Sequence, residues 1–307
     1  MLAASWSTLF EPGFFSSEPV RVALIVGAIT AIVSGVVGVF TVIRGQSFAG
    51  HALSDIGTAG GSAAFLVGAS TLYGFVAFNV VAAGVMELIG IRKPRGRDLA
   101  TGIVLGASLG LAALFLYEGT ISTSTTGATV NVLFGSIFTL PPGITTVMAV
   151  LGVTAVVLIG VLYRPLLLSS VSYELAAARG VPVRLVGAGY LLALALAVSM
   201  SAVTIGAILS TALLIGPAAI ALRVASRTGV AIAIAAAVGV VACWAGTLIA
   251  YDSTVWAGGN GWPVSFCIVV VIFVFYIASG VVSRFRRNRR RATTTDQPLA
   301  VKPVEAA

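Results

Sequence analysis

The sequence contains few charged residues, one histidine and two cysteines. Only 9% of its 307 residues are charged, whereas 58% are hydrophobic and the mean hydropathy is +1.07. A water-soluble domain of this length needs a more polar surface, so the composition excludes that class and predicts an all-α, polytopic helical membrane protein. Cys243 and Cys267 lie inside apolar runs and form no CxxC motif, which argues against a structural zinc site.

Long apolar runs divide the chain into regular segments. The net charge is +8, but the basic residues lie in the gaps between these runs, which argues against nucleic-acid binding. We predict nine spans, each near the ~20 residues that a membrane crossing requires, at residues 21–43, 51–70, 72–91, 99–117, 143–163, 185–203, 205–222, 229–250 and 263–283. For residues 185–222 an alternative to two spans is one span followed by a re-entrant segment.

The positions of Lys and Arg predict the orientation. If the N-terminus lies outside, every Lys and Arg except Arg21 falls on the cytoplasmic side, as the positive-inside rule requires. We therefore expect a multi-pass protein of the cell (plasma or inner) membrane, N-out and C-in. Residues 1–20 form its extracytoplasmic N-terminal segment and 21–283 its transmembrane domain. Residues 284–307 form a basic cytoplasmic tail with the composition of a disordered segment.

Two acidic residues, Glu118 and Asp252, fall near predicted outer ends of spans. One interpretation is an acidic outer mouth that gathers cations. The other is that acids are tolerated there because they contribute little to topology.

His51 is the only histidine of the chain, and Asp55 follows it by four residues within an apolar, glycine-rich segment. In a helix this spacing puts both side chains on one face, about 5–6 Å apart between Cβ atoms. An unpaired Asp at the bilayer centre costs about 2.5–3.5 kcal/mol, so such a residue faces protein or water and usually a substrate path. The glycines predict a broken or tightly packed helix. The structural alternative is a His–Asp hydrogen bond that only stabilises this segment.

A short helix is predicted in the cytoplasmic loop after the fifth span. Ser172 can cap it, Glu174 lies in its first turn, Ala177 propagates it and Gly180 ends it. So short a helix is unstable in water alone and must pack on something. It is either a docking helix for a partner or the capped beginning of the next span.

Three segments together resemble the metal-type ABC permeases, the membrane subunits of zinc, manganese and iron importers. They are residues 44–68 (RGQSFAGHALSDIGTAGGSAAFLVG), 131–140 (NVLFGSIFTL) and 172–227, which begin SYELAAARGVPVRL. In that family the box of the first segment commonly has Asp first and His four residues later. Here His51 comes first and Asp55 second, so the two ligand types exchange depths.

The resemblance implies a permease subunit of an ATP-driven importer of divalent manganese or zinc, with iron as a third option. It implies a second permease copy, as a homodimer or as a paired permease, a separate cytoplasmic ATPase dimer and a separate extracytoplasmic metal-binding protein. His51 and Asp55 would coordinate the transported ion, which is the substrate and not a permanently bound cofactor. The helix containing Ser172, Glu174, Ala177 and Gly180 would couple to the ATPase. The sequence has no GxxxxGK[ST] motif, which agrees with an ATP site on another subunit.

Two other classes remain to be compared. A secondary cation carrier would use His51 and Asp55 as a proton or ion relay, but such carriers often contain inverted repeats, and we recognise none here. An intramembrane enzyme would need a nucleophile–base pair or a metal triad, and one histidine without an HExxH motif fits that poorly. The sequence therefore indicates a transporter subunit and not an enzyme.

The predicted orientation can be tested with a reporter. A C-terminal fusion to an enzyme that is active only in the cytoplasm should be active, because the basic loops and tail stay inside. Activity of a matched reporter that functions only outside the cytoplasm would contradict the N-out, C-in arrangement.

Overall fold

The structure, a computed structural model, describes residues 14–89, 94–123, 127–135, 137–140, 143–256 and 261–295. Within these ranges the chain is helical apart from short connections, as the composition predicted. In chain order the elements are α2 (Glu18–Ile43), α3 (Ser47–Leu66), α4 (Thr71–Ile89), α5 (Pro94–Thr123), α6 (Gly127–Phe134), η1 (Ile137–Thr139), α7 (Ile144–Val171), α8 (Tyr173–Ala178), α9 (Val183–Ile205), α10 (Ala207–Val224), α11 (Thr228–Trp256) and α12 (Val264–Thr295).

Each of the nine predicted spans corresponds to one long helix of the described chain. Eight of these, all but α3, are long and apolar enough to cross a membrane. The helix α3 has 20 residues, but His51, Asp55 and its serines and glycines make it less apolar. The remaining predicted span, 51–70, is therefore present as α3, a helix whose polar side chains need protein neighbours to shield them from lipid.

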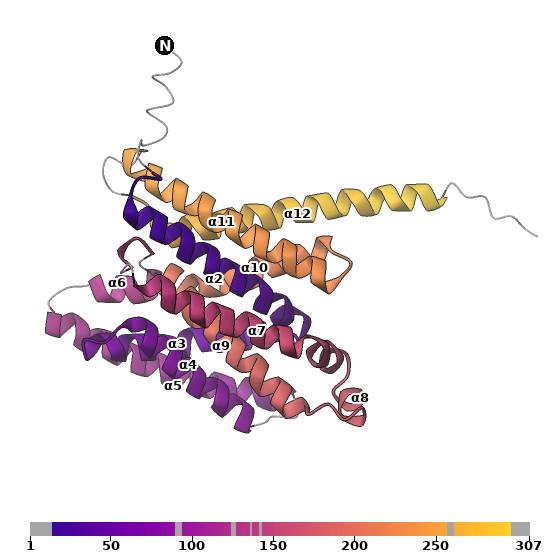
Figure 1. The fold of residues 1–307 in the computed structure, drawn as a ribbon, viewed down its shortest axis with the longest axis horizontal. Coiled ribbons are helices and arrows are strands. Elements are labelled where there is room, and N and C mark those ends of the chain that lie inside the picture. Colours follow the sequence, from indigo (N-terminus) through magenta and orange to yellow (C-terminus); the bar gives the residue numbers. More distant parts are fainter. Residues whose placement is uncertain are drawn as a thin grey trace, which may run out of the picture.

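The ends of the described chain lie at opposite ends of the bundle, as an odd number of crossings requires (Figure 1). The short helix α8 lies at the end away from the N-terminus. The helix α12 runs on beyond the bundle to Thr295, past residue 284, where the predicted tail begins. Residues 296–307 lie outside the described residues. Arg and Ala are good helix formers, and a helix that is already formed extends without a new nucleation cost.

The helix α9 occupies the centre of the bundle (Figure 1), and every residue from Tyr190 to Ile205 except Leu192 is buried. Hydrogen bonds attach it to two neighbouring helices. Ser201 and Ser34 of α2 lie 2.9 Å apart, and the Asn79 amide of α4 donates to Ser199 at 2.9 Å. These two hydrogen bonds join polar side chains of facing helices within the apolar interior, while the Asn79 Oδ1 oxygen has no partner among the described residues.

Residues 185–222 form two helices and not one span with a re-entrant piece. A single residue, Gly206, joins α9 to α10, and its φ of 87° is a conformation that glycine adopts without strain. The end of α6 packs against this turn: a Cβ on Gly206 would lie 2.2 Å from the Leu133 carbonyl oxygen. The sequence analysis predicted no helix between the spans 99–117 and 143–163, so α6 was missed.

The helix α3 is continuous and tightly packed, so the predicted break is wrong and the predicted close packing is confirmed. Three of its four glycines, Gly57, Gly60 and Gly61, lie against α4. A Cβ on Gly60 would come within 2.3 Å of the Gly74 carbonyl oxygen, and one on Gly61 within 2.4 Å of the Phe75 ring. Small residues let two membrane helices approach in this way because their backbones can touch.

The close contact between α3 and α4 predicts a sharp difference between two glycines. Gly60→Ala should destabilise the protein by about 1–3 kcal/mol, because the methyl group overlaps backbone atoms that cannot rotate away. Gly84→Ala, on α4, is the matched control, since a Cβ there meets nothing within 4 Å. The midpoint of thermal unfolding in detergent should fall for the first variant and stay near that of the parent protein for the second. Equal midpoints would contradict this packing.

Candidate metal site and coupling helix

The pair predicted from the sequence is formed in the structure. His51 Nε2 lies 3.5 Å from Asp55 Oδ2, one helical turn away on α3. The side chains are 49% and 16% exposed, although most other residues of this helix are buried. The helix therefore presents an imidazole and a carboxylate on the one face that this chain leaves uncovered.

The polar face of α3 continues beyond this pair. Thr58 and Ser62 follow at helical spacing and are buried. Their hydroxyls donate to carbonyl oxygens of their own helix, Thr58 to Ser54 at 3.0 Å and Ser62 to Thr58 at 2.6 Å. Each hydroxyl oxygen keeps acceptor capacity after donating its proton. The sequence analysis did not select these two residues, although their spacing from Asp55 was a visible signal.

The pair supplies two ligands, which is fewer than an ion prefers. In the described part of the chain, no group of three or more His, Cys, Asp or Glu residues could hold a metal. Imidazole and carboxylate suit several divalent transition metals. An ion at this position would take its remaining ligands from water, backbone or another chain.

The short helix predicted after the fifth span is present as α8, and its ends are formed as predicted. The Ser172 hydroxyl accepts a hydrogen bond from the Leu175 amide at 3.2 Å, and Glu174 lies in the first turn. At the other end Gly180 donates to the Ala177 carbonyl at 3.0 Å, and the next amide, of Val181, donates to a carbonyl one residue earlier. This is the Schellman arrangement, which ends a helix with a left-handed residue.

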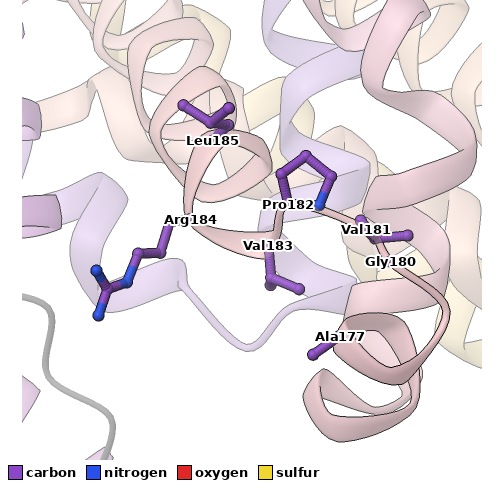
Figure 2. A pocket seen from close by; sticks show the side chains of 7 residues that line it. All are labelled: Ala177, Gly180, Val181, Pro182, Val183, Arg184 and Leu185. Atoms are coloured by element: carbon purple, nitrogen blue, oxygen red, sulfur yellow. The ribbon is translucent and has the colours of Figure 1, made fainter.

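One side of α8 packs on the protein and the other is uncovered. Ala176 is fully buried, whereas Leu175 is 46% exposed and Glu174 and Ala177 are exposed. Beside the helix lies a hollow lined by Ala177 and residues 180–185; Figure 2 shows it between α8 and the start of α9. The exposed apolar side and this hollow fit a partner on the membrane surface.

The two acids suggested for an outer mouth are not brought together. Figure 1 shows α5, which carries Glu118, and α11, which carries Asp252, on opposite sides of the bundle. Glu118 is exposed, but the Asp252 side chain is only 2% exposed. A buried carboxylate at this position does not present its charge to solution.

Comparisons with known proteins agree with this architecture. Residues 16–282 match the model of the ABC 3 transport family. The chain belongs to the ABC 3 transport family. The predicted transmembrane domain, 21–283, coincides with the matched region, and membership of a transport family supports a transporter subunit over an enzyme.

Two relatives of this ABC 3 chain are named as membrane components of manganese transport systems. The manganese import system permease protein ScaB of Streptococcus parasanguinis is 30% identical over 178 residues, which are 58% of this chain and 62% of that protein. The manganese transport system membrane protein MntC of Halalkalibacterium halodurans is 28% identical over 182 residues, 58% of this chain and 60% of that protein. The chain therefore matches less than two thirds of either relative's length.

Solved structures of ABC transporters share the fold of this chain. PsaBC from Streptococcus pneumoniae in complex with Fab has a TM-score of 0.75 and 26% identity, covering 91% of this chain and 95% of that chain. An inward-facing metal-chelate type ABC transporter has a TM-score of 0.65 and 18% identity over 85% of each chain, and at that identity it shows the fold alone. The resemblance to metal-type ABC permeases is thus confirmed.

The end of α8 predicts a position-specific effect at Gly180. Its φ is 76° and a Cβ there would meet nothing within 4 Å, so only the backbone conformation matters. Gly180→Val should cost about 1–2 kcal/mol and accelerate amide hydrogen exchange in residues 175–181 about tenfold. Gly180→Asn is the control, because Asn tolerates the left-handed conformation. Equal exchange in both variants would show that α8 does not depend on this turn.

Proposed function

We propose that this chain is the membrane subunit of an ATP-driven importer of divalent manganese, with His51 and Asp55 as ligands of the transported ion. The observation that carries the proposal is the 3.5 Å His51–Asp55 pair on the uncovered face of a membrane helix. Most buried hydroxyl groups of the bundle bond a carbonyl of their own helix or pair with a facing helix, whereas this ionisable pair is partly exposed. An ionisable pair placed there marks a substrate path.

The ligand chemistry and the relatives together favour manganese. One imidazole and one carboxylate suit manganese, zinc and iron, and oxygen-rich completion of the site by water or carbonyls favours manganese. The two named relatives are manganese permeases. Zinc and iron are the competing substrates that a transport assay must include. A site with only two protein ligands per chain also releases its ion readily, as transport requires.

A second copy of the chain would complete the site. The uncovered face of α3 exposes 49% of the His51 side chain, and such a surface in a membrane protein is best covered by protein. A two-fold partner would bring an identical pair to the same ion, because the interface of a symmetric dimer uses the same patch on both copies. This arrangement supplies four side-chain ligands without any further polar residue from the described chain.

The energy would come from a separate cytoplasmic ATPase dimer. The uncovered side of α8, with Glu174, Leu175 and Ala177, and the adjacent hollow form the surface proposed for docking. A separate extracytoplasmic protein would deliver the ion at the opposite end of the bundle. Closure of the ATPase would move α8 and, through the bundle, the helices that hold the ion.

Substitution at the pair tests this function. His51→Ala and Asp55→Ala should each abolish manganese uptake by the complete complex in proteoliposomes, with protein abundance near that of the parent. The exchange variant His51→Asp/Asp55→His should retain some uptake, because it keeps both ligand types one turn apart. His51→Gln is the control for structure, since an amide can still donate to Asp55 but is a poor ligand for the ion.

The structural alternative gives a different pattern. If the pair only stabilises α3, each alanine variant should lose abundance, because it leaves a polar group unpaired at roughly 1–3 kcal/mol, and His51→Gln should transport normally. Alanine variants that accumulate and transport as the parent does would disprove the site. Uptake of zinc in preference to manganese by the parent complex would reassign the substrate.

A further inference from the structure

Arg44 lies where α3, the helix that carries His51 and Asp55, meets α7 and α9, the helices on either side of α8. It is the last residue of the turn that ends α2, and α3 begins three residues later. Its Nη1 donates to Ser169 Oγ at 2.9 Å, and Ser169 lies near the end of α7, just before α8. Its guanidinium carbon also lies 5.1 Å from the centre of the Tyr190 ring of α9, which follows α8.

The same turn of α2 is attached to α9 a second time. The Tyr190 hydroxyl, which is fully buried, donates to Thr41 Oγ1 at 3.0 Å. Thr41 in turn donates to the Val37 carbonyl, and its own carbonyl accepts from the Gln46 amide at 2.9 Å, which closes the turn into α3. The start of α3 is thus fixed to both helices that connect to α8, through side chains with little freedom to move.

We propose that Arg44 is the positioning residue that transmits movement of α8 to α3. This inference rests on the proposed function. A planar guanidinium can donate to a hydroxyl at its edge while its face lies on an aromatic ring, so one side chain holds Ser169 and Tyr190 in a fixed relation. When α7 and α9 shift with α8, they carry Arg44 and the first turn of α3 with them. His51 follows Arg44 by seven residues, so it would move with that turn.

A second arginine of the chain provides a matched control. Arg223 on α10 donates to the Tyr276 hydroxyl of α12 and lies 3.9 Å from the centre of that ring. It makes the same kind of contact, but α10 and α12 do not flank α8. Removing either arginine should therefore disturb local packing, whereas only Arg44 lies between α8 and α3.

The first readout is the number of manganese ions transported per ATP hydrolysed by the complete complex in proteoliposomes. Arg44→Ala should lower this ratio by about fivefold or more, the lower end of ordinary coupling between sites, while ATP hydrolysis continues. Arg223→Ala should leave the ratio near that of the parent. Adding Ser169→Ala to Arg44→Ala should change nothing further, because the two act through one contact. A proportional fall of transport and hydrolysis would assign Arg44 a purely structural role and overturn the proposal.

A second readout does not depend on the metal. Phe48→Cys places a thiol on the face of α3 that the second copy is proposed to cover, so its reactivity reports how that interface opens. In the single chain the parent side chain is 43% exposed, and the native Cys243 and Cys267 are buried. Its rate of reaction with a maleimide should differ between the nucleotide-free and ATP-bound complex, and Arg44→Ala should remove the difference. A difference that persists in that variant, or is absent in the Phe48→Cys complex without it, overturns the proposal. If the Phe48→Cys complex shows the difference but the parent complex transports no manganese, the proposed function is disproved instead.

Discussion

The interior of a bilayer offers no water to a polar group, and this constraint orders the whole molecule. The central helix α9 meets it by pairing with its neighbours: Ser201 with Ser34, Ser199 with Asn79, and Tyr190 with Thr41. Backbone groups meet it by remaining helical through nearly all of the described chain. The His51–Asp55 pair differs from these groups because it is ionisable and partly exposed, and an ionisable residue within a membrane span is by default a candidate functional site.

The helix α3 combines two opposite requirements on its two sides. Toward α4 it has glycines, and Gly60 approaches the backbone of its neighbour so closely that a methyl group does not fit. On the other side it carries the polar face that begins with His51. The close packing against α4 holds the helix in place without covering His51 and Asp55, so these two side chains can remain partly exposed without loosening the bundle. Fixed ligand positions are what an ion site between two copies would require.

The end of the bundle at which α7 meets α9 adds a short helix, α8, whose geometry is determined locally. Ser172 begins α8, Gly180 ends it, and Ala176 seats it on the bundle. The side chain of Arg44 lies between the helices on either side of α8 and the start of α3. The surface that would receive the ATPase and the helix that would hold the ion are thus separated by only a few contacts, which gives the proposed transport cycle a short mechanical route.

The sequence by itself determined the number of long helices, their positions to within a few residues (α5, α7, α11 and α12 run six to twelve residues further at an end), the His–Asp pair and both ends of α8. These features depend on local signals: apolar length, helical spacing and capping residues. Only the tertiary structure decided which face of α3 stays open, where α6 packs, how far Asp252 is buried and what Arg44 contacts. Those properties depend on helices distant in the chain, and periodicity within one segment carries no information about its neighbours.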